Sequence, residues 1–237
     1  MSEGKTPPRR RILVVDDEAE LRRLLAWILT DLGHAIETAA DGAEALEILQ
    51  QQAPHLMILD ILMPRVDGWG VLRAMSALPK RPPVLVLTGL VDYPSFLRAV
   101  REGASAFLVK PFRFQDLVSI CERMLATDGE PPDDERRAHR RRLLITDVDL
   151  LSADGAPLTR GDLVNVSRSG ARLDLGVPLA EGNHVRLAVN IPGQARPLRL
   201  HATVQWQKPF GHFFAHGLRF AELGADEERF LADILAP

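Results

Sequence analysis

The sequence predicts an α/β doubly wound domain with a five-stranded parallel sheet, followed by an all-β domain that ends in a short C-terminal helix. Over residues 10–127, short apolar runs alternate with helical patterns, which is typical of strand–helix units around a parallel sheet. Residues 136–237 instead alternate apolar and polar side chains in short runs broken by glycine and proline, which indicates antiparallel strands. The final run "ADEERFLADILA" has the apolar spacing of one helix.

The strands of the first domain are expected to be buried on both faces. Four runs are almost wholly apolar and "HAIETA" is a weaker fifth; the four are "ILVVDD", "HLMILD", "PVLVLTG" and "AFLVK". Helical patterns follow these runs: "EAELRRLLAWILTDLG", "DGAEALEILQQ", "GWGVLRAMSAL", "YPSFLRAVREG" and "FQDLVSICERMLA". Gly33 is expected to end the first helix, and Asp41 with Glu44 to cap the second.

Six alternating runs in the second half predict the strands of a β-barrel or a sandwich. The boundary between the domains is expected at the Pro131–Pro132 pair, because a helix cannot continue undisturbed through two prolines. Residues 128–135, which are rich in acidic side chains, are therefore predicted to form a linker. The six runs are "LLITDVDLL", "PLTRGDLVNVS", "GARLDLG", "NHVRLAVNI", "RLHATVQWQK" and "HFFAHGLRFAEL".

Composition narrows the class of protein. The chain has 237 residues, of which 46% are hydrophobic and 26% charged, so each half can bury a core of its own. A net charge of −3 provides no overall basic field that would attract nucleic acid or an anionic membrane. Cys121 is the single cysteine, which excludes an intramolecular disulfide. With a polar N-terminus and no long apolar run, the expectation is a cytoplasmic protein without a signal peptide or membrane insertion.

Charged and hydroxyl side chains follow four strands of the first domain. Asp16 and Asp17 follow the first strand, Asp60 the third, Thr88 the fourth and Lys110 the fifth. They are expected to meet, because the carboxyl ends of parallel strands share one edge of a sheet. Crowded carboxylates repel one another unless a cation such as Mg²⁺ joins them. With a lysine and a hydroxyl for phosphoryl oxygens, the set predicts a phosphoryl-transfer site whose nucleophile is a carboxylate.

This half of the chain resembles the receiver domain of two-component response regulators, a flavodoxin-like fold. The matching segments are the Asp16–Asp17 pair, "DILMPRVDGWG" around Asp60, Thr88, and "GASAFLVKPF", which contains Lys110. The resemblance implies that a histidine kinase phosphorylates Asp60. It also implies the other roles: Asp17, Asp60 and the Leu62 carbonyl as Mg²⁺ ligands, Asp16 acting through water, Thr88 and Lys110 holding the phosphoryl group, and Phe107 as the switch aromatic. A plain core residue is an equally good interpretation of Phe107.

An arginine run precedes the first strand of the second domain, and "NVSRSG" lies downstream. A guanidinium can bind phosphate through two hydrogen bonds or pair with a guanine edge. Asn and Ser beside a glycine can offer hydrogen bonds at a tight turn. These elements resemble the RxxxR and [D/N]xSxxG motifs of the PilZ domain, a receptor for cyclic di-GMP with a six-stranded barrel. The residues that fill the motifs are Arg137, Arg141, Asn165, Ser167 and Gly170.

Arg136 stands just before the first motif, and the resemblance then favours an intercalated dimer of cyclic di-GMP.

Alternatives stay open for the second domain. The arginines can be a solvated run balanced by the preceding acidic residues, because exposed ion pairs contribute only about 0–1 kcal/mol. A barrel that has lost nucleotide binding would serve as a protein-interaction module. A DNA-binding regulator or a phosphoester enzyme is less favoured, since the net charge is negative and aspartyl phosphate is the only phosphoryl chemistry indicated. The output is expected to be an unknown protein partner.

Three further residue types have plain structural interpretations. His212 and His216 are four residues apart and are expected on the barrel surface rather than as a metal pair. The three tryptophans, Trp27, Trp69 and Trp206, are expected to pack in apolar patterns. Cys121 lies in an amphipathic helical pattern and is expected to be a small core residue.

Overall fold

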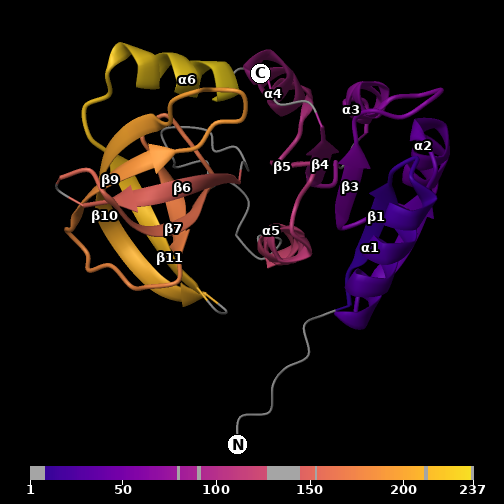
Figure 1. Ribbon diagram of the computed structural model, residues 1–237, viewed down its shortest axis with the longest axis horizontal. Helices are drawn as coiled ribbons and strands as arrows, with labels where there is room; N and C mark the ends of the chain where they lie inside the picture. Colours follow the sequence, from indigo (N-terminus) through magenta and orange to yellow (C-terminus); the bar gives the residue numbers. More distant parts are fainter. Residues whose placement is uncertain are drawn as a thin grey trace, which may run out of the picture. The chain divides into compact units, whose positions relative to one another are not determined.

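A computed structural model describes residues 9–78, 81–89, 92–126, 145–152, 154–210 and 213–235. Contacts between Cα atoms divide the chain into two compact units, residues 1–90 with 102–130 and residues 91–101 with 131–237. A parallel sheet forms the core of the first unit and a barrel that of the second (Figure 1). Among the described residues, no helix is long and apolar enough to cross a membrane.

The predicted five-stranded parallel sheet is confirmed, with the strand order β2-β1-β3-β4-β5. Both central strands β3 and β4 are buried at every position, whereas the edge strand β2 has two exposed residues, Glu37 and Thr38, which explains its weaker apolar pattern. The strands are β1 (Arg11–Val15), β2 (Ala35–Ala39), β3 (Leu56–Asp60), β4 (Val84–Thr88) and β5 (Ala106–Val109). The helices are α1 (Ala19–Asp31), α2 (Gly42–Gln51), α3 (Gly68–Met75), α4 (Tyr93–Glu102) and α5 (Phe114–Ala126).

The local helix signals hold in the structure. Helix α1 ends at Asp31, and Gly33 two residues later has a φ of 91°, a left-handed conformation that glycine adopts without a Cβ clash. Asp41 caps α2, because its Oδ1 accepts hydrogen bonds from the backbone N–H groups of Ala43 at 2.8 Å and Glu44 at 3.1 Å. Glu44 returns a bond, since its Oε2 accepts from the N–H of Ala40 at 2.7 Å. The start of α2 is therefore fixed by two acidic side chains.

The second unit contains a closed antiparallel barrel in the order β10-β11-β8-β7-β6-β9, which decides between the barrel and the sandwich. Inward-facing side chains such as Leu150, Leu163, Leu173 and Leu187 are almost fully buried and form its core. Helix α6 packs against β10 (Figure 1). The elements are β6 (Thr146–Leu151), β7 (Pro157–Val164), β8 (Gly170–Leu175), β9 (His184–Val189), β10 (Leu198–Phe210), β11 (Phe213–Phe220) and α6 (Ala225–Leu235).

His216 is fully buried, so its expected place on the barrel surface is wrong. It pairs with Leu173 in the β8–β11 register and therefore points to the same inward face. Its Nε2 accepts a hydrogen bond from the Leu179 N–H at 3.0 Å, which leaves Nδ1 as the protonated nitrogen that donates to the Leu173 carbonyl at 3.1 Å. Sequence spacing cannot reveal this, because the register decides which face of β11 is buried. His212 lies outside the described residues.

Trp27 was expected to pack, but 68% of its surface is exposed. The reason is helical geometry: α1 turns Leu25 and Leu29 toward the sheet, and a residue midway between them lies about 200° around the helix. Trp69 and Cys121 are buried as predicted, and burial raises the pKa of the Cys121 thiol. Trp206 covers the backbone of β11, since a Cβ on Gly217 would lie 2.0 Å from the indole Nε1.

The buried His216 makes the barrel sensitive to acid. Burial lowers the pKa of this imidazole from its ordinary value of 6.5. Below 6.5 the unfolded chain takes up a proton that the folded ring does not, so the stability contributed by the neutral ring is complete above this pH and is lost as the pH falls through the folded pKa. We therefore expect the apparent melting temperature of the barrel to fall between neutral pH and about pH 5.5, measured by circular dichroism.

His216→Gln provides the control for this effect. Its amide retains one donor and one acceptor but does not titrate, so the melting temperature should depend less on pH than in the wild-type protein. His34 also has a pKa lowered by burial, but it is present in both proteins and cancels in the comparison. Equal pH dependence in the variant and the wild type would contradict the assignment.

Candidate functional site

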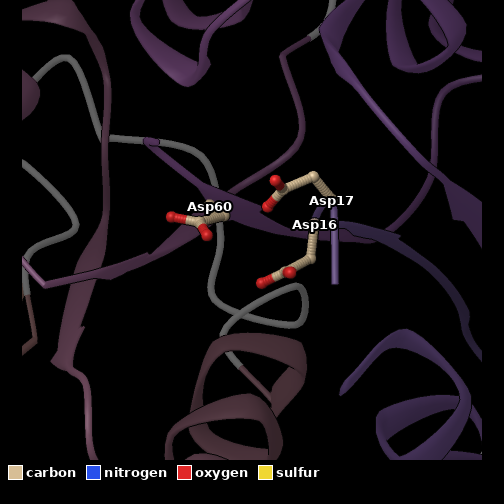
Figure 2. Close-up of side chains that lie close together, drawn as sticks. All are labelled: Asp16, Asp17 and Asp60. Carbon is tan, nitrogen blue, oxygen red and sulfur yellow. The ribbon is translucent and has the colours of Figure 1, made fainter. Parts of the chain in front are cut away.

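Three carboxylates meet at the carboxyl edge of the sheet. Strands β1 and β3 are parallel neighbours, with Val15 opposite Leu59. The residues that come next along the two strands, Asp16 and Asp60, therefore lie side by side. Asp17 follows directly, and oxygens of the three carboxylates lie within 4.8 Å of one another. Figure 2 shows the three side chains gathered around one point. The pairing of β1 with β3 therefore brings the predicted acidic residues to one place at the sheet edge.

Lys110 reaches the same point from the end of β5. Its Nζ donates hydrogen bonds to Asp16 Oδ2 at 2.8 Å and Asp60 Oδ2 at 2.7 Å. Glu18 Oε1 lies 3.8 Å from the same nitrogen. Burial disfavours the charged amine, but the bonds to Asp16 and Asp60 outweigh it and hold the pKa of Lys110 above its usual value. The lysine is thus a fixed positive charge between two buried carboxylates.

The two acidic residues at the end of β1 have different surroundings. Asp16 is fully buried, and burial raises its pKa although Lys110 and the Glu18 N–H, which donates to Oδ1 at 2.8 Å, oppose the shift. Asp17 is exposed and leaves its carboxylate open to a ligand. Arg22 further fixes this turn by donating from Nη1 to the Asp16 carbonyl at 2.5 Å. Sequence reasoning missed Glu18 and Arg22, which carry no motif signal beyond their closeness to the acidic pair.

The donor set fits Mg²⁺. It consists of hard carboxylate oxygens from three side chains that lie within 4.8 Å of one another, close enough to share one ion. Asp17 is exposed and can ligate an ion directly, whereas Asp16 and Asp60 are buried and each accepts a hydrogen bond from Lys110. Leu62 follows Asp60 by two residues, and its N–H donates to Asp60 Oδ1 at 3.1 Å, which ties the loop backbone to the carboxylate.

Thr88 and Phe107 lie on one face of the sheet. Thr88 is the last residue of β4, is 5% exposed, and stands opposite Val109 in the register with β5. Phe107 is two residues before Val109 on the same strand and is half-buried. Since side chains alternate along a strand, Thr88 and Phe107 point to the same side. This arrangement is compatible with both interpretations of Phe107, as a switch residue and as a core residue.

In the barrel, the "NVSRSG" motif forms the tight connection between β7 and β8. Asn165 has a φ of 52°, a left-handed conformation that asparagine tolerates better than most residues. Ser167 donates from its backbone N–H and its Oγ to the Gly170 carbonyl, at 2.8 and 3.0 Å. A Cβ on Gly170 would lie 2.0 Å from the Leu218 carbonyl oxygen. Each motif residue therefore meets a backbone requirement of the turn, quite apart from any ligand.

The other predicted ligand residues of the barrel, Arg136, Arg137 and Arg141, lie outside the described residues, as does the predicted linker. One buried ion pair close to the motif was not foreseen. Arg172 donates from Nε and Nη2 to the two carboxylate oxygens of Asp174, at 2.7 and 2.8 Å, and both side chains are almost fully buried. The signal was present as two polar residues at alternating positions of "GARLDLG".

Family models match both halves of the chain. The response regulator receiver domain matches residues 12–122 and the PilZ domain matches residues 135–236. The chain therefore contains a response regulator receiver domain followed by a PilZ domain. The receiver domain is the module that accepts a phosphoryl group in two-component signalling, and the PilZ domain is of the type that binds cyclic di-GMP.

Curated relatives align with part of this chain. The probable transcriptional regulator ycf27 of Cyanophora paradoxa is 39% identical over 123 residues, 52% of this chain and 51% of the relative. The response regulator MprA of Mycobacterium ulcerans is 32% identical over 165 residues, 70% of this chain and 66% of the relative. The chain thus spans about half the length of the first of these relatives and about two thirds of the second.

Solved structures of response regulator proteins are similar to about half of this chain. The Francisella response regulator 1452 receiver domain has a TM-score of 0.49 at 22% identity, covering 51% of this chain and 99% of that one. The response regulator protein TrrA from Thermotoga maritima, in complex with Mg²⁺-BeF, has a TM-score of 0.44 at 36% identity, covering 48% of this chain and 98% of that one.

The contact at Gly170 leads to a test of the turn. Gly170→Ala places a methyl group against a backbone carbonyl that cannot move without disturbing β11, so we expect the barrel to lose about 1–3 kcal/mol of stability in urea unfolding. Gly176→Ala is the matched control, because a Cβ there meets no atom of the described residues within 4 Å. Equal stability of the two variants would contradict the close contact between Gly170 of β8 and the backbone of β11.

Proposed function

We propose that the protein is phosphorylated on Asp60 by a histidine kinase, binds cyclic di-GMP through its barrel, and passes both signals to a protein partner. The observation that carries the first part is the Lys110 amine, which lies 2.7 Å from the Asp60 carboxylate beside two further acidic residues. This combination supports the proposal, because phosphorylation of a carboxylate needs a nucleophilic oxygen, a positive charge and oxygen donors for a metal ion close together.

The residues divide the chemistry of phosphorylation among themselves. Asp60 supplies the attacking carboxylate oxygen. The backbone N–H of Leu62 holds the other oxygen, Oδ1, by a hydrogen bond of 3.1 Å. Lys110 and the Thr88 hydroxyl are at the strand ends where they can bind phosphoryl oxygens. Asp16, Asp17, Asp60 and the Leu62 carbonyl would hold Mg²⁺, which when bound offsets the negative charge that accumulates on the phosphoryl group.

Asp60→Asn should abolish phosphorylation. Incubation of the full chain with acetyl phosphate and MgCl₂ is expected to add one phosphoryl mass to the wild-type protein and none to the variant, measured by intact mass spectrometry. Asp67→Asn is the matched control, because Asp67 is an aspartate on the same loop whose side chain caps α3 by accepting from the Gly70 N–H at 2.8 Å. Labelling of the Asp60 variant would refute the phosphoacceptor assignment.

The nucleotide-binding part of the proposal is supported by the order of the two motifs and by the geometry of the second. Asn165 and Ser167 are held at a rigid turn that Gly170 allows to lie close against β11. Arginines that precede β6 in the sequence supply the positive charge that a cyclic dinucleotide requires. Arg136, beside the motif, is proposed to support an intercalated dimer.

Calorimetric titration with cyclic di-GMP tests this part. We expect the wild-type protein to bind two nucleotides per chain, and Arg137→Ala or Arg141→Ala to lose binding by a factor of at least about ten, since a charged hydrogen bond is worth about 1.5–3 kcal/mol. Arg199→Ala is the control, an exposed arginine on β10. A stoichiometry of one would contradict the role of Arg136, and no binding by the wild type would make the barrel a protein-interaction module.

A further inference from the structure

The loop between β3 and α3 carries Leu62 beside the phosphoacceptor, and its two ends are tied down by backbone hydrogen bonds. The Gly68 N–H donates to the Ile61 carbonyl at 3.0 Å, which closes the loop on itself. The Gly42 N–H, at the start of α2, donates to the Val66 carbonyl, also at 3.0 Å. The position of this loop therefore depends on the first residues of α2.

A side-chain contact reinforces this connection. Arg65 Nη2 forms an ion pair with Asp41 Oδ2, while the other oxygen of Asp41 accepts the two N–H bonds that cap α2. The Asp41 side chain is 1% exposed and that of Arg65 is 72% exposed. Removing a carboxylate from water is costly unless it is paired, so the buried Asp41 strongly favours keeping the arginine in place. Because the Arg65 side chain is mostly exposed, its own burial does not hold it beside Asp41.

The backbone of Arg65 is also unusual. Its φ of 64° lies in the left-handed region, which residues with long side chains rarely adopt. Such a conformation persists only where surrounding contacts impose it, and it is enriched at ligand sites. At Arg65 these contacts are the ion pair with Asp41 and the neighbouring hydrogen bond of Val66 to α2. The ion pair thus helps to hold the loop in a conformation that it would otherwise leave.

We propose that Arg65 and Asp41 are positioning residues for the divalent metal site, a role that rests on the proposed function of Asp60. Their ion pair fixes the loop of residues 61–67, and with it the Leu62 backbone that is bonded to the Asp60 carboxylate. Neither side chain ligates the ion. Outer partners of metal ligands commonly change metal affinity by about 10- to 100-fold, and we expect the low end of that range because Arg65 is exposed.

Titration of the full chain with MgCl₂ by calorimetry, at constant ionic strength and without a phosphodonor, measures this directly. Arg65→Gly removes the ion pair but leaves a residue that adopts a positive φ without strain. Asp41→Asn keeps a capping side chain and removes the charge. We expect each variant to bind Mg²⁺ about tenfold more weakly, and the double variant to lose little more than either single one, because the two residues act through one contact.

Two further variants separate positioning from general effects. Arg65→Lys retains the charge and should restore most of the affinity, whereas Arg73→Ala, an exposed arginine on α3, should leave the affinity unchanged. Metal-free melting curves of Arg65→Gly and Arg65→Lys should both lie well above the titration temperature, with Arg65→Gly the lower because it leaves the buried Asp41 without its ion pair, which shows that both proteins are folded during the titration. If Arg65→Gly binds Mg²⁺ within twofold of the wild-type affinity, the positioning role of Arg65 and Asp41 is overturned and the proposed function is untouched. If the wild-type protein does not bind Mg²⁺, both the positioning role and the proposed phosphoacceptor site are overturned.

Discussion

The Lys110 amine between two buried carboxylates is the interaction on which the receiver half depends. Asp16 and Asp60 are brought together by the pairing of β1 with β3, and two adjacent negative charges out of water would repel each other. Lys110 bonds to both, and its own raised pKa keeps it charged. The same contacts leave the Asp60 carboxylate beside a fixed positive charge, the arrangement on which the proposed phosphorylation of Asp60 rests.

The barrel depends on constraints of a different kind. At the β7–β8 connection the backbone of Gly170 lies against β11, and Asn165 takes a left-handed conformation. In the core, the buried His216 bonds the backbone N–H of Leu179 and the backbone carbonyl of Leu173. The two halves therefore differ in what they offer, with fixed charges at the edge of the sheet and a turn held by close backbone contacts in the barrel.

Most of the fold and the acidic site could be predicted from the sequence, because strand runs, helix caps and the edge of a parallel sheet follow local rules. Predictions failed where a residue's surroundings depend on register or on the far side of a helix. His216 is buried because β11 pairs with β8, and Trp27 is exposed because Leu25 and Leu29 take the inner face of α1. The ion pair between Arg65 and Asp41 joins two segments that no motif connects.

The role of Lys110 is tested most directly by the carboxyl pKa of Asp16, measured by ¹³C NMR titration of the wild-type protein and of Lys110→Met. Burial raises this pKa, and Lys110 is the side chain that opposes the shift. The pKa of Asp16 should therefore be above its ordinary value of 3.8 in the wild type and higher still in Lys110→Met. An unchanged or lower pKa in the variant would contradict the claim that this lysine holds the carboxylates together.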